Sequence, residues 1–524
     1  MPSDVSTQCL VLGAGPAGLQ ASYLLARDGR DHLVLEAGER PGAFFTRFPR
    51  HRTMISNNKV VTGYTDPELN LRMDWNSLLN DDPELLFTRY TPKYFPPADE
   101  FVRYLGDFAT KHDLPVRLGT RVAEITRPDD FVVRDQDGNT YRAPRMIVAT
   151  GVSKPYVPPI EGIELAEPYV DMPVDPAGFH GQRVLVIGRG NSAFETADNL
   201  IETAAVIHVV GPGSLKLAWR THFVGHLRAV NNNFLDTYQL KSQNALLDGT
   251  VQSIRREGEQ LLVKVAFARV AERVKEIRYD RVLLAAGFRF DASIFASECR
   301  PNLTIKDRFP EQTSSWESTN VPDLFFAGTI TQARDFKKST SGFIHGFRYS
   351  VRALHRVMEH RYHAVAWPRQ NLAASPAAIA DAVIARVNRT SALWQQFGFL
   401  CDAVLVGRDS SVHYLEEVPV AYLHEAVARG EFGDVDSYFA VTLEYGADHD
   451  TVDPFDITAG RVSQESTSGL DGRYLHPAVR RFRAGELIGE HHITENLENE
   501  WDSEEVHRAP LVRFLGAQLD PVPA

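Results

Sequence analysis

Cysteine is scarce in this chain, and its scarcity excludes two kinds of protein. The 524 residues include three cysteines, Cys9, Cys299 and Cys401, and no C-x-x-C pair. This excludes a small disulfide-held scaffold and a redox dithiol that is local in sequence. So few thiols in a long chain are typical of a reducing compartment, and we predict a cytoplasmic protein.

Excess positive charge and long apolar runs are also missing. The formal net charge is −12, so we expect no nucleic-acid partner. Residues 9–26 are apolar but interrupted by glycines and a proline, which predicts a strand, a turn and a helix rather than a membrane span. The first residues lack the features of a signal peptide. No metal-ligand spacing occurs, since the adjacent His491 and His492 cannot share one metal on a helix face, and we predict no metal.

The length suits two or three domains, and the order of strands and glycine turns predicts an α/β fold. We expect two Rossmann-like dinucleotide-binding domains followed by a C-terminal α+β region. The FAD-binding domain is placed at residues 1–152 and 285–369. The NAD(P)H-binding domain is inserted between these two parts, at 153–284, and the C-terminal region covers 370–524.

The first glycine turn follows the apolar run at residues 9–12 and precedes a helical segment at residues 17–27. It reads Gly13-Ala14-Gly15-Pro16-Ala17-Gly18, which matches G-x-G-x-x-G. Such a turn brings backbone N–H groups and a helix N-terminus to a pyrophosphate. Glu36 ends the next strand, where a carboxylate can accept hydrogen bonds from ribose hydroxyls. We assign this unit to FAD, with Gly13, Gly15, Pro16, Ala17, Gly18 and Glu36 as cofactor-binding residues.

A second turn of the same kind indicates a second nucleotide. It follows a predicted strand at residues 183–187, and its cofactor-binding residues are predicted to be Gly188, Gly190, Asn191 and Ser192. The return strand ends in Val210-Gly211-Pro212 without an acid, and Lys216 and Arg220 follow. An acid there would repel a 2′-phosphate, so the pattern favours NADPH over NADH. An alternative of equal weight is that Lys216 and Arg220 are ordinary surface charges.

Other predicted cofactor contacts come from strand ends and loops. Val148-Ala149-Thr150-Gly151 and Leu284-Ala285-Ala286-Gly287 flank the second unit and mark crossings between the domains. Ala327-Gly328-Thr329 precedes a helix expected at residues 341–360, whose N-terminus can stabilise negative charge on reduced flavin. The contacts predicted from these segments and from the loop after Glu36 are Gly42, Arg47, Gly151, Gly287, Gly328, Gly342 and Phe343.

Catalytic and substrate residues are predicted by type and position. Asn57, Asn58 and Lys59 would lie near the flavin ring, with a polar turn as the alternative. His345 would be a proton donor near the flavin, or else a histidine that packs within its helix. A polar wall on the nicotinamide side, or else a surface helix and turn, is predicted from four substrate residues: Arg220, His222, Arg228 and Asn231.

These turns, in this order, resemble the two-dinucleotide-binding flavoproteins, and among them the class B flavin monooxygenases over about residues 7–365. That resemblance implies FAD, NADPH and a flavin hydroperoxide that oxygenates N, S or a carbonyl carbon. The chain departs from the class signature F-x-G-x-x-x-H-S-x-x-Y. The signature should run just before the second turn, and by spacing back from Phe179 and Gly181 the position expected for its histidine holds Tyr169.

A longer resemblance covers almost the whole chain. It is to the family of the ER flavoprotein associated with degradation, also called FAD-dependent oxidoreductase domain-containing protein 2. With no signal peptide and the ending Pro521-Val522-Pro523-Ala524, we expect a soluble bacterial relative. The strings that carry it are Arg50–Arg52, Ser56–Lys59, Asp74–Leu79, Gly188–Glu195, Asn231–Ser242, Gly342–Tyr349, Tyr414–Glu417 and Leu475–Pro477.

Together these features predict a flavin monooxygenase. Molecular oxygen and a small molecule are the expected partners, and N-hydroxylation of an amine or amino acid in a biosynthetic pathway is the preferred reaction by class analogy. An NADPH-dependent reductase or oxidase that passes electrons to a partner is the first alternative. A flavoprotein whose C-terminal region docks other proteins is the second, and this region is also the candidate for a homodimer contact.

Overall fold

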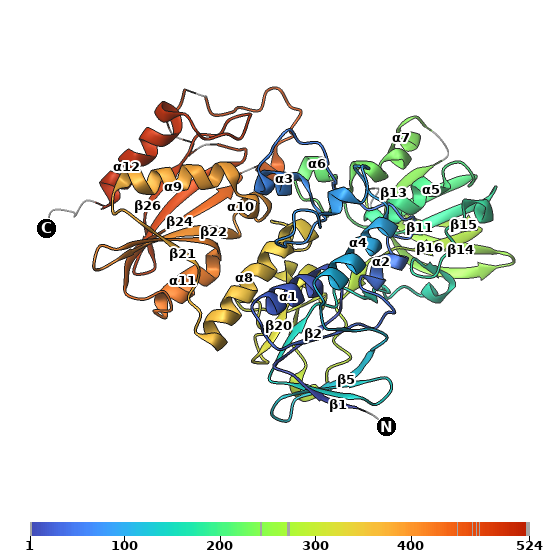
Figure 1. Cartoon of the computed structure of the whole chain (residues 1–524). Helices are drawn as coiled ribbons and strands as arrows, with labels where there is room; N and C mark the ends of the chain where they lie inside the picture. The colour runs from blue at the N-terminus through green and yellow to red at the C-terminus, as the bar shows by residue number, and fades with distance from the viewer. Residues whose placement is uncertain are drawn as a thin grey trace.

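The computed structural model describes residues 3–241, 244–269, 273–447, 449–463, 465–467, 469–470 and 472–519. Ser242, which ends one of the strings that carry the family resemblance, and Pro521–Ala524, on which the expectation of a soluble relative rests, lie outside this description. Figure 1 shows three bodies: a central unit that carries the N-terminus, a second unit on the right, and a C-terminal region on the left.

The central unit is built on a parallel sheet in the order β20-β8-β2-β3-β4. Each strand is short, and β2, β8 and β20 are mostly or fully buried, which suits a sheet covered on both faces. A four-stranded sheet, β1-β7-β6-β5, packs against one face. The strands are β2 (Cys9–Leu12), β3 (Leu33–Leu35), β4 (Val116–Arg117), β8 (Arg145–Val148), β20 (Leu324–Phe326), β1 (Asp4–Ser6), β5 (Val122–Thr126), β6 (Phe131–Asp135) and β7 (Thr140–Ala143).

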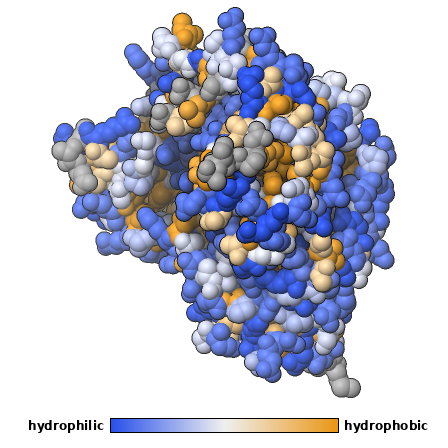
Figure 2. All heavy atoms as spheres, turned by 90° about the vertical axis from the view of Figure 1, so that its left-hand side faces the viewer, coloured by the Kyte–Doolittle hydropathy of each residue, from blue (hydrophilic) through white to orange (hydrophobic). Residues whose placement is uncertain are grey.

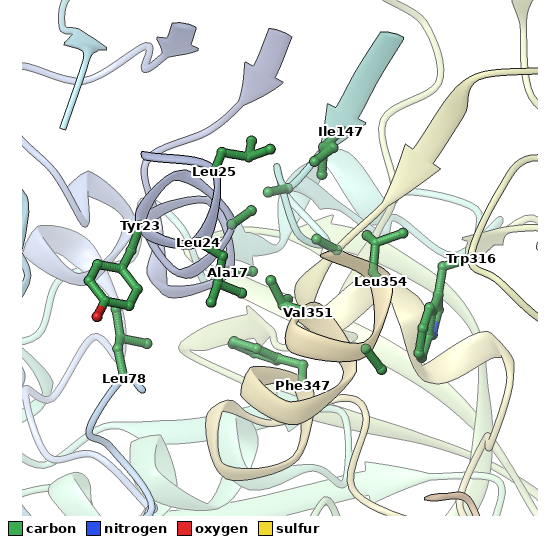
Figure 3. Packing of buried hydrophobic residues seen from close by; sticks show 14 of the residues in the cluster. Ala17, Tyr23, Leu24, Leu25, Leu78, Ile147, Trp316, Phe347, Val351 and Leu354 are labelled. Carbon is green, nitrogen blue, oxygen red and sulfur yellow. The ribbon is translucent and has the colours of Figure 1, made fainter. Parts of the chain in front are cut away.

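Helices cover the other face of this sheet. Helix α1 packs on α8, and Figure 3 shows Ala17 and Leu24 facing Val351 and Phe347 across that contact. Since α8 follows β20 far along the chain, this packing brings the end of the predicted FAD-binding sequence beside its first turn. The helices of this unit are α1 (Pro16–Arg27), α2 (Ala43–Arg47), α3 (Pro67–Met73), α4 (Ala98–Lys111) and α8 (Ile344–His363).

The second unit has a seven-stranded sheet in the order β10-β16-β11-β12-β13-β14-β15. Its first five strands are parallel, and the long β13 continues into an antiparallel hairpin. The elements are β10 (Glu167–Pro168), β11 (Arg183–Ile187), α5 (Asn191–Leu200), β12 (Val206–Gly211), α6 (Ala218–Thr221), α7 (Asn233–Gln239), β13 (Ala245–Glu257), β14 (Gln260–Phe267), β15 (Arg273–Tyr279) and β16 (Arg281–Leu284).

Two chain crossings join the units, and they run side by side. Strand β9 (Lys154–Pro155) pairs antiparallel with β17 (Phe288–Arg289). Each lies just beyond one of the predicted crossing glycines. The predicted domain boundaries at 152/153 and 284/285 remain predictions.

The C-terminal region is a six-stranded antiparallel sheet with helices on both faces. Alternate residues of each strand point to opposite faces: Val404 and Phe439 pack toward α9 and α12, whereas Leu405 and Tyr438 belong to the cluster that includes α8 and α11. The elements are β21 (Arg369–Leu372), α9 (Pro376–Arg389), α10 (Ser391–Gln395), β22 (Leu400–Gly407), β23 (Val412–Pro419), α11 (Val420–Ala428), β24 (Val435–Glu444), β25 (His476–Arg483), β26 (Glu486–His492) and α12 (Ala509–Leu519).

A buried ion-pair cluster ties this region to α8. The Glu417 carboxylate, 2% exposed, lies 2.5 Å from the guanidinium of Arg352, 3.3 Å from that of Arg356 and 3.1 Å from that of Arg386. Burial raises the pKa of Glu417, but the three cations outweigh it and lower this pKa to about 2. The carboxylate is therefore charged and fully paired, and it fixes β23 against α8.

Short elements complete the chain. They are the strands β18 (Leu303–Thr304) and β19 (Phe309–Pro310), the 3₁₀ helices η1 (Phe87–Arg89), η2 (Ile163–Leu165), η3 (Pro176–Phe179), η4 (Ala229–Asn231), η5 (Ser297–Cys299), η6 (Gly328–Ala333) and η7 (His449–Thr451), and the π helix η8 (Glu504–Arg508). Within the described ranges, no helix is long and apolar enough to cross a membrane. Figure 2 shows a mostly hydrophilic face with scattered apolar patches.

Candidate active site between the two nucleotide turns

One large cavity, of about 640 Å³, lies between the central and second units. Its walls come from both glycine turns and from the N-terminus of α8. A volume in this range suits a cofactor or small-molecule site. The predicted site residues that line it are Gly13, Gly15, Pro16, Ala17, Glu36, Gly151, Asn191, Ser192, Arg228, Gly328, Gly342, Phe343 and His345.

The first turn fits a dinucleotide diphosphate. Gly13 has φ +98°, and a Cβ there would lie 2.9 Å from the Ala149 carbonyl oxygen. A Cβ on Gly18 would lie 1.8 Å from the Gly13 oxygen, so only glycine lets α1 start this close to the turn. Gly15 caps α1 without a side-chain hydrogen bond. The first N–H groups of the helix are therefore available to an anion in the cavity.

Glu36, which was predicted to bind a ribose, lines the cavity beside the first turn. Its Oε2 accepts a hydrogen bond from the Ala14 N–H at 2.7 Å and its Oε1 accepts one from the Gly38 N–H at 2.8 Å. These bonds orient the carboxylate at the cavity wall. Each oxygen keeps a further lone pair, which can accept a bond from a ribose hydroxyl.

The second turn has the same construction. Gly188 has φ +137°, and a Cβ there would lie 2.2 Å from the Ala285 oxygen. Gly190 caps α5 without a side-chain hydrogen bond. The Asn191 side chain binds the segment that follows β12, called here the excursion after β12. Its Nδ2 donates to the His226 carbonyl oxygen at 2.9 Å, and its Oδ1 accepts from the Arg228 N–H at 3.0 Å.

His345 is buried in the cavity wall, with 2% of its surface exposed. Its ring stacks on the Trp75 indole at 4.1 Å between centroids. Burial, with the nearby Arg348 and Arg228 cations, lowers the pKa of His345 well below 6.5, so the imidazole is neutral. Neither ring nitrogen has a partner among the described residues. A neutral imidazole offers one donor and one acceptor, and burying both unpaired is costly, so this ring fits a polar ligand.

Arg228 also contacts the Trp75 indole. Its guanidinium is 5.2 Å from the centroid of the Trp75 ring, and its Nη2 donates to the Asn57 Oδ1 at 2.9 Å. Three segments far apart in sequence therefore meet at this end of the cavity: the one around Trp75, the excursion after β12 and the start of α8. The aromatic residue at their centre was not among the residues predicted from the sequence, although the string Asp74–Leu79 that contains it carries part of the family resemblance.

Asn57, Asn58 and Lys59, which were predicted to be catalytic, have different surroundings in the structure. Asn57 positions Arg228 from outside the cavity lining. Asn58 is 1% exposed, and its Nδ2 donates to the carbonyl oxygens of Thr91 and Lys93 at 2.7 and 3.2 Å, which joins two loops. Lys59 is exposed. Neither Asn58 nor Lys59 lines the cavity, so the polar-turn alternative describes both better.

The remaining cofactor predictions lie beside the cavity rather than in its lining. Gly18, Gly188 and Gly190 form the turns themselves. Gly42 caps α2 against Leu105. Arg47 pairs with Asp171 at 2.6 Å across the two units. Gly287 lies at the crossing, where its oxygen accepts from the Tyr156 N–H at 2.9 Å.

The other substrate predictions also lie outside the lining. Arg220 is exposed on α6. The His222 ring contacts that of His449 at 3.7 Å between centroids, so it joins the second unit to the C-terminal region. Asn231 is buried, and its Nδ2 donates to the Asn191 Oδ1 at 3.1 Å.

A further pair at the cavity was not predicted as functional. The Tyr169 O–H donates to the Glu195 carboxylate, and the Arg50 N–H donates to the Tyr169 oxygen at 3.1 Å. Burial raises the pKa of Glu195 to about 7, although the hydrogen bonds from Tyr169 and Arg50 lower it. The signal available in the sequence was Tyr169 itself, the residue found where the signature histidine was expected.

Comparisons with known proteins agree with this architecture. Residues 10–328 match the family model of the pyridine nucleotide-disulphide oxidoreductases. The zebrafish (Danio rerio) FAD-dependent oxidoreductase domain-containing protein 2 is 37% identical over 580 aligned residues, which cover 98% of this chain and 83% of the relative. The chain belongs to this family. Membership confirms the predicted resemblance, and with it an FAD-dependent oxidoreductase with FAD and NADPH as cofactors.

Solved structures share the fold of the family with different chemistries. A flavin-containing monooxygenase from Stenotrophomonas maltophilia has a TM-score of 0.53 at 20% identity, covering 68% of this chain and 99% of that chain. A bacillithiol disulfide reductase from Staphylococcus aureus has a TM-score of 0.51 at 17% identity, with the same coverage of both chains. These matches confirm the predicted α/β fold with two dinucleotide-binding units. They do not distinguish oxygenation from disulfide reduction, so the site must do so.

Proposed function

We propose that the protein is a single-component monooxygenase that uses NADPH, FAD and molecular oxygen to oxygenate a small molecule, with N-hydroxylation of an amine or amino acid as the preferred reaction. NADPH, a proton, O₂ and the substrate give NADP⁺, water and the oxygenated substrate, which balances atoms and electrons. When bound, reduced flavin supplies the two electrons that activate oxygen.

The observation that carries the proposal is that no thiol lines the cavity. All three cysteines of the chain are described, and all are buried and unpaired. Burial raises the pKa of Cys9 to about 12 and raises that of Cys401 well above 9. Thiols held protonated are poor nucleophiles. Disulfide reduction, which the family description names, therefore lacks a reactive thiol beside the flavin site.

The residues of the cavity suit the proposed reaction. The first turn and Glu36 would hold FAD, and Asn191 and Ser192 would meet NADPH. The neutral His345 would donate or accept a hydrogen bond at the bound ring system without adding charge. Trp75 and Phe343 would keep water from the reacting atoms, which limits unproductive release of hydrogen peroxide.

Stopped-flow kinetics test the proposal. The FAD-loaded protein is reduced anaerobically with NADPH and mixed with ¹⁸O₂ in the presence of candidate amines. We expect slow flavin reoxidation, little hydrogen peroxide and one ¹⁸O atom per product molecule. Reoxidation in one fast phase with one hydrogen peroxide per NADPH would refute it in favour of an oxidase. Absence of reduction by NADPH would favour a docking flavoprotein.

A cysteine-free variant separates the oxygenase from a reductase. Replacement of Cys9, Cys299 and Cys401 by alanine removes every thiol of the chain. We expect NADPH-dependent oxygenation to continue in this variant at a rate within about two-fold of the parent. Electron transfer to a disulfide substrate that disappears with the thiols, while FAD stays bound, would contradict the proposal.

A further inference from the structure

Arg228 has no counter-ion among the residues that the structure describes. Its side chain is partly buried at the cavity. Its guanidinium donates a hydrogen bond to the neutral amide of Asn57. Burial lowers the pKa of Arg228, which reports the cost of removing this cation from water. An anion in the cavity would relieve that cost.

The guanidinium is held in place for such a ligand. The Arg228 N–H is bonded to Asn191, the Nη2 to Asn57, and the planar group lies over the Trp75 ring. Arginine has five N–H donors, of which Asn57 occupies one. The free edge of a guanidinium fits a carboxylate with two parallel hydrogen bonds. The site therefore favours a carboxylate over a neutral amide.

The cavity that Arg228 lines also has apolar and aromatic walls. They include Trp75, Phe343 and Val224. The Phe343 ring is nearly parallel to that of His345, at 10° and 5.8 Å between centroids. Among the described residues, neither nitrogen of the neutral His345 has a hydrogen-bond partner. Such walls suit a planar or apolar body attached to the carboxylate, with one polar atom that can reach the imidazole.

We propose that the substrate is an apolar or aromatic carboxylate whose carboxylate binds Arg228 and whose body lies against Trp75 and Phe343. That the bound carboxylate is a substrate rests on the proposed function. That it binds to Arg228 does not. A phosphate of NADP⁺ is the other source of an anion for this guanidinium. Asn191 and Ser192 at the second turn give the nucleotide a separate helix N-terminus, which leaves Arg228 to the carboxylate.

Ligand binding to the oxidised, FAD-loaded protein tests the proposal without NADPH or turnover. Phenylacetate and its neutral amide, phenylacetamide, are titrated while the flavin absorbance is followed, and affinities are checked by equilibrium dialysis. We expect phenylacetate to bind at least about ten-fold more tightly than the amide, because a charge-assisted bidentate contact is lost in the amide. Equal affinity for the two compounds would overturn the proposal.

Three variants separate the roles of the cation. Arg228→Met should weaken phenylacetate binding by roughly 10- to 100-fold and leave the amide unchanged, and Arg228→Lys should lie between. Arg220→Met is the matched control, since Arg220 is exposed in the same excursion of the chain. FAD content at the parent level shows that each variant is folded.

Measurement of NADP⁺ binding completes the test. Its dissociation constant should stay within about two-fold in Arg228→Met. If this variant weakens NADP⁺ binding and not phenylacetate binding, the guanidinium serves the nucleotide and the proposal is wrong. Because neither measurement uses oxygen, a failed oxygenation assay leaves this result standing, and a failed carboxylate titration leaves the monooxygenase proposal standing.

Discussion

Glu195 offers a quantitative prediction, because its carboxyl group is buried without a full countercharge. The residue is 8% exposed, lines the cavity and accepts the Tyr169 O–H. Burial raises its pKa from 4.5 to about 7, and the hydrogen bonds and the nearby Arg50 cation only partly offset this. The perturbation is Glu195→Gln, which removes the titration but keeps an oxygen that can accept from Tyr169.

The magnitude and sign follow from the raised pKa. At about 1.4 kcal/mol for each step of one in pKa, a change from 4.5 to about 7 corresponds to roughly 3 kcal/mol. Between these two pH values the folded protein binds more protons at Glu195 than the unfolded chain does, so the free energy of unfolding falls as pH rises. The contribution is fully present below pH 4.5 and lost above pH 7. Glutamine removes this slope.

Thermal unfolding of the FAD-loaded parent and variant, between pH 4.5 and pH 8, measures the effect. The stability of the parent relative to Glu195→Gln should fall by roughly 3 kcal/mol across this range. The exposed Glu259→Gln is the matched control and should run parallel to the parent. Infrared difference spectra should show a protonated carboxyl band that titrates near pH 7 and is absent from the variant. Parallel stability curves for parent and Glu195→Gln would refute the reasoning.

Three further predictions concern the turns and the buried charges. Gly18→Ala places a Cβ 1.8 Å from a backbone oxygen of the first turn and should lower the FAD content at least about ten-fold. Gly106→Ala, whose Cβ would have no atom within 4 Å, should leave the FAD content unchanged. Absorbance spectra measure the FAD content of both variants. Glu417→Gln removes the buried carboxylate that Arg352, Arg356 and Arg386 share and should cost about 3–5 kcal/mol of unfolding free energy. The half-exposed Glu416→Gln should cost less than about 1 kcal/mol. Asn191→Leu removes three hydrogen bonds that hold the excursion after β12 and should weaken phenylacetate binding about ten-fold while FAD stays bound; unchanged affinity would show that the cavity arginine is positioned by other contacts.

Much of the fold was predictable from the sequence because its signals are local. A glycine turn between a buried strand and a helix has backbone requirements that the residues themselves express, so both turns could be predicted, and the structure places them and Glu36 at one cavity. The helix expected at residues 341–360 begins at Ile344 and ends at His363, a difference of three residues at each end. The spacing of the three cysteines was enough to exclude a local dithiol, since that motif is defined by sequence alone.

The tertiary structure decided which polar residues share the cavity. Trp75, Arg228 and His345 are separated by more than 100 residues along the chain, and only the packing of the second unit against the central unit brings them into contact. Conversely, Lys59, Arg220 and His222 have suitable side chains but lie elsewhere. A sequence pattern states what a residue can do with its immediate neighbours. The pattern does not state which distant segment will pack against the residue. That segment determines whether a histidine is buried and neutral and whether an arginine has a carboxylate beside it.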